Sequence, residues 1–320
     1  MARIGYRWEN LEYLSDVRFI CANRVTMHIR KIALNELEVV VDLIARLQPD
    51  EEHHIGYFGM EADDIRQYLL EFTHGWENSI VIAIHHDEIV GCLAVEWDME
   101  TNRAWLHGPC IDHVAWHIIA DKLYDGAKES GVLPTGLEEE LWGDVVNVKL
   151  GAFARRHYFR KMEGHSVIFR FQRDQLHTLP SLGADLIEAR YYDAFIALHE
   201  KTFPHAYYTG QQILEKLVGQ NWVFVVTQNE ALLGYVYARI DTDGQGYIDF
   251  LGVAEKARRQ GIGKRLIVAA TRWLLSYEDV AQVNLTVSSS NRAAIALYLN
   301  IGYEHLLTLT AYRKRPNVGE

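Results

Sequence analysis

The sequence is poor in cysteine and has no long hydrophobic run. Its three cysteines, Cys21, Cys92 and Cys110, show neither disulfide-type nor zinc-type spacing. No apolar stretch approaches the roughly 18 residues of a membrane span. The first residues, MARIGYRWENLEYLSD, contain no apolar core of a secretory signal. These absences predict reduced thiols, no membrane partner and a cytoplasmic location.

Positive charge is scarce as well. The chain has 32 Lys and Arg residues against 43 Asp and Glu residues, which gives a formal net charge of −11. A dedicated nucleic-acid binder needs a basic face that neutralises phosphates, so no nucleic-acid partner is expected. What remains is an ordinary globular composition, with 49% hydrophobic and 23% charged residues, in 320 residues that suggest about two domains.

An internal repeat organises the chain, and its first part is a pair of hairpins. VIAIHHDEIVGCLAVEWD, residues 81–98, predicts two strands joined by a turn at Asp87-Glu88. VFVVTQNEALLGYVYARID, residues 223–241, repeats this plan with its turn at Asn229-Glu230. The two segments predict the same strand–turn–strand unit in each half.

The second part of the repeat is a helix that follows at a fixed distance. Asn147 lies 56 positions after Gly91, and Asn291 lies 57 positions after Gly234. Each Asn opens a stretch of helical period, with an aromatic residue 12 positions later. Because these features recur in the same order, the sequence predicts a duplication.

The predicted domains follow from this repeat. Each copy begins with a strand and an amphipathic helix, at Met27 and near Ala184. We therefore expect an N-terminal extension at 1–26 (or residues upstream of a natural start), one domain at 27–175, a linker at 176–184 and a second domain at 185–320. The alternation of strands and helices predicts an α/β fold, with one mixed, mostly antiparallel sheet flanked by helices in each copy.

A glycine-rich basic loop precedes one of these helices. After the strand-like run GYIDFLGV comes AEKARRQGIG and then the helical run KRLIVAATRWLL. Free N–H groups and the helix dipole at such a junction form an anion site that glycine lets a ligand approach. A P-loop would need glycine at Arg258, and a dinucleotide fingerprint would need glycine at Leu266. A solvated basic turn is the alternative.

Arg258, Gly261 and Gly263 form the pattern Arg-x-x-Gly-x-Gly, which resembles the cofactor motif of the GNAT (GCN5-related N-acetyltransferase) family. NLTVSSSNRAAIALYLNIGY, residues 284–303, is similar to that family's second signature. The resemblance covers about residues 184–315, and the two-copy arrangement is similar to that of mycothiol synthases. It implies acetyl-CoA as cofactor, with the pyrophosphate in the loop. The cofactor-binding residues that it implies are Leu251, Val253, Arg258, Arg259, Gln260, Gly261, Ile262, Gly263, Lys264 and Asn291.

The resemblance also implies three catalytic residues. An amine that attacks a thioester must be neutral, the developing oxyanion needs a donor, and the leaving thiolate needs a proton. The Val253 N–H is the expected oxyanion donor, and Tyr298 is the expected acid, although it could be only a core aromatic. Asp249 is the expected base, through water, or a strand carboxylate with no such role. Tyr235, Tyr237 and His205 are alternatives to Asp249.

The acceptor would lie near FPHAYYTG, residues 203–210, where Tyr207 and Tyr208 are the expected wall. The first copy lacks a Gly-x-Gly loop and has Ala154 in place of Tyr298 and Tyr158 in place of Gly302. It is therefore expected to be a degenerate partner domain. No metal is expected, because His113 and His117 lack an acidic or cysteine partner at a suitable spacing.

The predicted function is acetyl transfer from acetyl-CoA to the primary amine of a small molecule, directly in a ternary complex. Two alternatives stay open: a protein or peptide amine as acceptor, and a regulatory protein that binds acyl-CoA without turnover. The sequence leaves the acceptor and the oligomeric state undecided.

Overall fold

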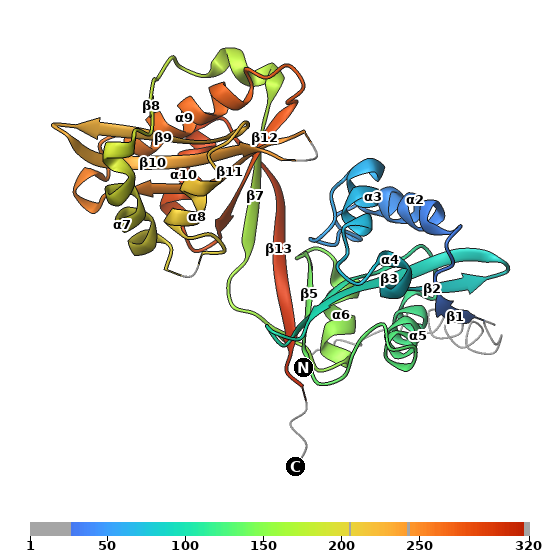
Figure 1. Ribbon diagram of the computed structural model, residues 1–320. Helices are drawn as coiled ribbons and strands as arrows, with labels where there is room; N and C mark the ends of the chain where they lie inside the picture. The colour runs from blue at the N-terminus through green and yellow to red at the C-terminus, as the bar shows by residue number, and fades with distance from the viewer. Residues whose placement is uncertain (1–26, 205, 242–243, 317–320) are drawn as a thin grey trace, which may run out of the picture. The chain divides into compact units, whose positions relative to one another are not determined.

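The computed structural model describes residues 27–316 except 205 and 242–243, so the predicted extension at 1–26 lies outside it (Figure 1). The chain forms two compact units. Of the described residues, unit 1 contains 27–141, 149–158 and 314–316, and unit 2 contains 142–148 and 159–313. No helix among the described residues has the length and apolarity needed to cross a membrane.

Unit 1 is built on the strand order β1-β2-β3-β4-β5, antiparallel except for the parallel pair β4 and β5. Its strands are β1 (His28–Lys31), β2 (Ile80–His85), β3 (Glu88–Asp98), β4 (Arg103–Ile111) and β5 (Glu138–Asp144). Its helices are α2 (Leu37–Leu47), α3 (Ala62–Leu70), α4 (Trp76–Ser79), α5 (Trp116–Glu129) and α6 (Val148–Arg156).

Unit 2 repeats this frame in the order β13-β7-β12-β11-β10-β9-β8, with β6 (Arg160–Lys161) on β13, and β11 and β12 run parallel. Its main strands are β7 (Ser166–Gln172), β8 (Asp185–Leu186), β9 (Asn221–Gln228), β10 (Ala231–Ile240), β11 (Gly246–Val253), β12 (Gln282–Ser288) and β13 (Glu304–Lys314). Its helices are η1 (Arg173–Thr178), η2 (Ala189–Tyr191), α7 (Tyr192–Thr202), α8 (Gly210–Glu215), η3 (Glu255–Ala257), α9 (Ile262–Leu274) and α10 (Arg292–Ile301).

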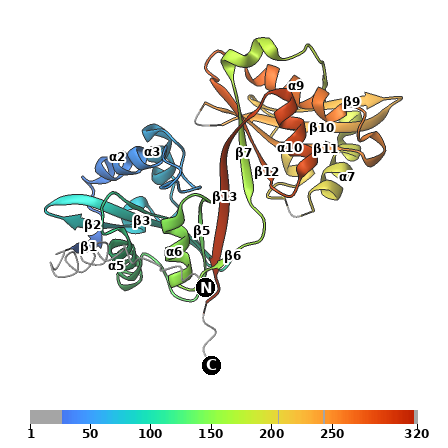
Figure 2. The same ribbon diagram turned by 180° about the vertical axis from the view of Figure 1, so that it is seen from behind.

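Strand β7 lies in unit 2, although it ends the first copy in the sequence. It pairs with β12 on one side and with β13 on the other (Figure 2). Its alternate residues Val167, Phe169 and Phe171 are buried in the core of unit 2. The predicted linker is also packed there, because Arg272 on α9 donates to the Leu179 carbonyl at 3.1 Å. The boundary at 176–184 stays a prediction about the duplicated sequence, whereas the compact unit begins earlier.

The two hairpins have two-residue turns of the type in which both residues have positive φ. In the second, Asn229 (48°) and Glu230 (61°) form the turn, as predicted. In the first, His86 (50°) and Asp87 (65°) form it, so the predicted turn at Asp87-Glu88 is wrong by one residue. Glu88 already pairs with His85, because a two-residue turn fixes the strand register on both sides.

Two apolar clusters cover opposite faces of the sheet of unit 2, because successive strand residues point to opposite sides. Val236 and Ala238 of β10 pack with the buried face of α9, which contains Leu266, Ile267, Ala270 and Leu274, with Trp273 at its edge. Tyr235 and Tyr237 of β10 face the other way, toward Phe195 of α7 and Ile213 of α8.

Candidate active site

The centre of the site is an opening between β11 and β12. The two strands pair over Gly246–Ile248 and Val283–Leu285 only, although β11 continues to Val253 and β12 to Ser288. Ala254 N–H donates to the Leu233 carbonyl at 2.8 Å, so the next pair, Gly234 with Val253, is a non-hydrogen-bonded pair of the antiparallel ladder. The N–H and C=O groups of Val253, and of Leu251 two residues earlier, therefore point away from β10 into the opening.

The loop that follows carries a row of N–H groups. Arg259 (φ 64°) and Gly261 (φ 80°) adopt left-handed conformations before α9 begins at Ile262. Among the described residues, no acceptor binds the backbone N–H groups of residues 259–264, and the first helical bond runs from Arg265 N–H to the Gly261 carbonyl. A Cβ at Gly261 would meet no protein atom within 4 Å. The loop and the helix dipole therefore fit the pyrophosphate of coenzyme A.

The side chains of this loop divide into two groups. Arg258, Arg259, Gln260 and Lys264 are exposed, with Arg258 Nε donating to the Val253 carbonyl at 3.3 Å and Gln260 to the Lys256 carbonyl at 2.9 Å. Ile262 packs partly into the core. Packing favours glycine at position 263, because a Cβ there would lie 3.2 Å from Leu297 Cδ2 of α10.

Tyr298 and Asn291 both come from α10. Tyr298 is 6% exposed and packs against Phe169 and Tyr303, each with a ring separation of 6.0 Å. Burial raises the pKa of its hydroxyl to about 12, so it keeps its proton at neutral pH. Asn291 caps the helix, since its side chain accepts from the Ala294 N–H at 3.2 Å. A contact of Asn291 with the cofactor stays a prediction.

Asp249 is the first residue of β11 beyond the parallel pairs, and it is ion-paired. Arg239 of β10 donates from Nε to Asp249 Oδ2 at 2.6 Å, and its Nη1 lies 2.5 Å from Asp241 Oδ2. The Asp249 side chain is 9% exposed. The Asp249 carboxylate thus accepts from Arg239, and the Tyr207 hydroxyl hydrogen-bonds to the same carboxylate. The sequence analysis missed Arg239, although it follows Tyr235 and Tyr237 at strand period.

The alternative bases are poor candidates. Tyr235 donates to His199 of α7 across 2.6 Å, and Tyr237 donates to Asn221 Oδ1 at 3.2 Å. Burial raises the pKa of Tyr237 to about 12 and that of Tyr235 further, so both hydroxyls hold their protons. His205 lies outside the described residues.

Two cavities flank these residues within unit 2. One, of about 370 Å³, is lined by the C-terminal part of α7 and by Val253, Lys256 and Arg258. The other, of about 580 Å³, is lined by Tyr208, Tyr237 and Arg239 among others. Tyr208 is thus a wall residue of a cavity, whereas Tyr207 is 64% exposed, with its ring 5.1 Å from that of Phe250.

Unit 1 has the frame without the loop. Four residues, 112–115, join β4 to α5, against the eight residues, 254–261, that join β11 to α9. Where β4 diverges from β5, His107 is 1% exposed and lies among aromatic rings, 4.5 Å from Tyr57 and 5.1 Å from Phe72. Tyr158, with φ 65°, occupies the left-handed position that Gly302 has in unit 2. Among the described residues, no group of three or more His, Cys, Asp or Glu side chains is arranged for a metal ion.

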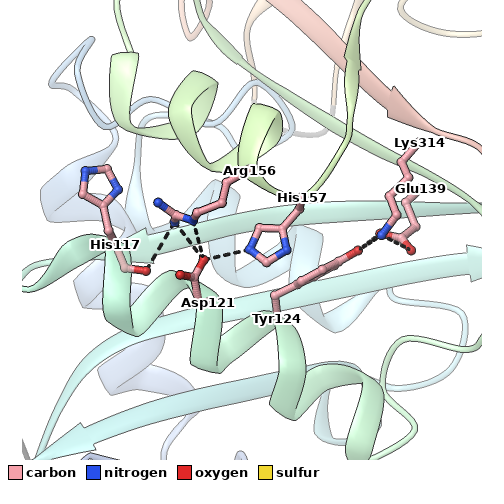
Figure 3. Close-up of polar contacts among 7 residues, drawn as sticks. All are labelled: His117, Asp121, Tyr124, Glu139, Arg156, His157 and Lys314. Atoms are coloured by element: carbon pink, nitrogen blue, oxygen red, sulfur yellow. Dashed lines mark hydrogen bonds and ion pairs between the residues drawn. The ribbon is translucent and has the colours of Figure 1, made fainter.

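The polar contacts at α5 and α6 of unit 1 are structural (Figure 3). Asp121 Oδ1 accepts from Arg156 at 2.8 Å and lies 2.7 Å from His157 Nε2. Tyr124 donates to Glu139 at 2.5 Å and accepts from Lys314 at 2.6 Å. These bonds join helix to helix and helix to strand.

Comparisons with known proteins agree with this geometry. Residues 188–303 match the model of the acetyltransferase (GNAT) family. A mycothiol acetyltransferase of Acidothermus cellulolyticus is 26% identical over 201 residues, which are 53% of this chain and 60% of that protein. An N-terminal acetyltransferase complex ARD1 subunit homolog of Dictyostelium discoideum is 41% identical over 69 residues, which are 21% of this chain and 34% of that protein. The chain thus spans less than two thirds of each relative.

Solved structures show the same fold over most of the chain. A GCN5-related N-acetyltransferase from Sphaerobacter thermophilus superposes with a TM-score of 0.69 at 16% identity, covering 92% of this chain and 97% of that one. A tandem GNAT protein from the clavulanic acid biosynthesis pathway superposes with a TM-score of 0.54 at 12% identity, covering 92% and 100%. The predicted tandem α/β fold is confirmed, and residues 188–303 are similar to the acetyltransferase (GNAT) family.

Proposed function

We propose that unit 2 transfers an acetyl group from acetyl-CoA to the primary amine of a small molecule, directly in a ternary complex. The observation that carries this proposal is the row of N–H groups at residues 259–264, placed beside the opening between β11 and β12. An anion site and a slot lined by strand N–H and C=O groups suit a ligand with a diphosphate and an amide-containing arm.

Acetyl-CoA supplies the acetyl thioester when it is bound. The N–H groups before α9 hold the diphosphate, and the Val253 N–H donates to the thioester oxygen as negative charge develops there. The Tyr298 hydroxyl gives its proton to the departing sulfur. The Asp249 carboxylate receives the proton of the attacking amine, through water.

The acceptor is the least constrained part of the proposal. A small-molecule acceptor is favoured by the similarity to a mycothiol acetyltransferase over 53% of the chain. A protein amine is the second candidate, favoured by the 41% identity to a subunit homolog of an N-terminal acetyltransferase complex, over a shorter stretch of 69 residues.

The test is a thiol-release assay with acetyl-CoA and a panel of amines, amino acids, aminoglycosides and peptides, with the product identified by mass. We expect turnover with at least one small amine and a mass increase of one acetyl group on it. Turnover on peptides alone would favour the second candidate. Coenzyme A binding without turnover on any acceptor would leave the role of a binding protein and overturn the proposal.

A further inference from the structure

A buried histidine joins the segment that carries the expected acceptor wall to the sheet. His199 of α7 is 0% exposed. Its Nε2 lies 2.9 Å from the Tyr208 carbonyl oxygen, and its Nδ1 lies 2.6 Å from the Tyr235 hydroxyl of β10. The segment 206–209, here called the acceptor loop, is therefore connected to the strand next to β11 through one imidazole ring.

The partners determine where the protons lie. A carbonyl oxygen only accepts, so Nε2 must carry the hydrogen that it shares with Tyr208. In the neutral ring Nδ1 is then an acceptor, and the Tyr235 hydroxyl donates to it. A proton added to Nδ1 would force the Tyr235 oxygen to accept, and the Tyr235 hydrogen would then need another acceptor.

The same tyrosine also contacts the strand of the reaction centre. A Cβ at Gly252 of β11 would lie 2.3 Å from Tyr235 Cε1, so the Tyr235 ring lies directly against the backbone that precedes Val253. The Tyr235 ring therefore contacts two parts of the site. It reaches the acceptor loop through His199, and it packs on β11 at Gly252, next to Val253.

A second hydrogen bond to α7 lies at the C-terminal end of the acceptor loop. Glu200, the neighbour of His199, accepts from the Gly210 N–H at 3.0 Å. Gly210 is close to α7, because a Cβ there would lie 2.9 Å from Ile196 Cα. With residues 208 and 210 both fixed to α7, Tyr208 is held at the wall of the 580 Å³ cavity.

We propose that His199 is the positioning residue of the acceptor site, which as a neutral Nε2–H imidazole fixes the acceptor loop against β10 and β11. The inference rests on the proposed acetyl transfer, since it gives the loop an acceptor to bind. The hydrogen bonds of His199 run to Tyr208 and Tyr235 and not to the cofactor loop, although its ring lies 4.9 Å from the ring of Phe250 on β11. Loss of His199 should therefore weaken acceptor binding and leave coenzyme A binding intact.

The kinetic test compares His199→Leu, His199→Gln and Tyr235→Phe with the wild type. Leucine removes both hydrogen bonds, so we expect acceptor KM to rise by about tenfold or more. Glutamine has a donor and an acceptor in one amide and should restore part of this loss. Tyr235→Phe removes one hydroxyl and should raise acceptor KM by a smaller factor. In all three, the Kd of coenzyme A measured by calorimetry should stay within about twofold of the wild type.

Tyr303→Phe is the matched control. Tyr303 is also buried in unit 2, and its hydroxyl makes a 2.6 Å hydrogen bond to Thr271 on α9, far along the chain from the acceptor loop. Its loss should lower thermal stability as Tyr235→Phe does, with acceptor KM unchanged. Equal rises of KM in the two Tyr→Phe variants would mean that KM follows stability, and would overturn the proposal.

The nitrogen-15 NMR spectrum of His199 tests the proposal without turnover. The wild type should show one protonated nitrogen, Nε2, and hydrogen exchange at residues 206–210 should speed up in His199→Leu. A protonated Nδ1, or unchanged exchange in the variant, would overturn the positioning role. If the acetyl-transfer proposal itself failed, the wild type would show no turnover while these two measurements stayed as expected.

Discussion

The two strand-to-helix connections, β4 to α5 and β11 to α9, differ in length and in backbone conformation. Both follow a strand that diverges from its parallel neighbour. The connection in unit 2 has eight residues, with left-handed conformations at Arg259 and Gly261, and the one in unit 1 has four. The comparison shows that the frame of a strand, a turn and a helix does not make an anion site. We expect the extra residues of unit 2, which expose the N–H groups, to make the anion site.

The two units also differ in the residue that follows the parallel pairs of β11 in unit 2 and of β4 in unit 1. In unit 2 the residue after the parallel pairs is Asp249, in an ion pair with Arg239 beside a cavity. In unit 1 it is His107, packed among rings, with neither ring nitrogen hydrogen-bonded among the described residues. Aromatic packing has filled in unit 1 the place that stays polar in unit 2.

The largest effect expected from this difference is on stability in acid. Burial lowers the pKa of His107 to about 3, from about 6.5 in an unfolded chain. Below pH 6.5 the folded state therefore binds fewer protons than the unfolded chain. The free energy of unfolding has its full His107 contribution above that pH, and it falls between pH 6.5 and 3 by at most about 5 kcal/mol.

His107→Leu should remove this dependence. In urea unfolding followed from pH 7 to pH 4, the wild type should lose more stability than the variant. The exposed residue His117 provides the control, because His117→Gln should follow the wild type. Parallel pH curves for the wild type and His107→Leu would show that His107 does not cause the loss.

The second effect concerns Tyr298, which unit 1 replaces by Ala154. Tyr298→Phe keeps the ring and its packing but removes the proton that the departing sulfur needs. Turnover should fall by about 10²-fold while the Kd of acetyl-CoA barely changes. Wild-type turnover in the variant on a good acceptor would make Tyr298 a packing residue, like its neighbour Tyr303.

The third effect concerns Gly261, the residue at which the loop is most open. Gly261→Val adds a Cβ where the diphosphate should lie, so coenzyme A affinity should fall by more than about tenfold, or about 1.4 kcal/mol. Gly136→Val in unit 1 is a matched control, since Gly136 also has positive φ (87°) and open space around its Cα. Calorimetry that finds equal affinity in both folded variants would remove the loop from the binding site.

The smallest effect is the contribution of unit 1 to cofactor binding, which we expect to be nil. Because the four-residue connection has no glycine, the whole chain should bind one acetyl-CoA. Two sites of similar affinity in calorimetry of the wild type would contradict the comparison on which the other predictions depend.

Local patterns in the sequence predicted much of unit 2. The period of Leu266, Ile267, Ala270 and Leu274 predicted α9, and two glycines beside arginines predicted the anion loop. These signals lie within one turn or one strand, where the sequence dictates the backbone directly. The turn lies at residues 86–87, one position before the predicted one. Asp87 and Glu88 are both acceptable turn residues, and only the pairing register of the two strands decides which residues form the turn.

Pairings between distant residues could not be predicted in this way. Strand β7 shows alternating apolar residues, but nothing local says that its partners are β12 and β13. The ion pair of Asp249 with Arg239 depends on the register of β10 with β11, including a bulge between Tyr237 and Ala238. The bond from His199 to Tyr235 joins residues 36 positions apart, and a histidine in a helix gives no sign of it.

The position of β7 has a consequence for synthesis of the chain. β7 ends at Gln172 and its partner β12 begins at Gln282, so about 110 residues separate them. At about 5–20 residues per second, β7 leaves the ribosome several seconds or more before either neighbour exists. Its apolar face therefore stays unpaired until β12 and β13 have been synthesised. Codon usage and chaperone access between residues 173 and 304 should therefore affect yield of unit 2 more than the same changes do before residue 159.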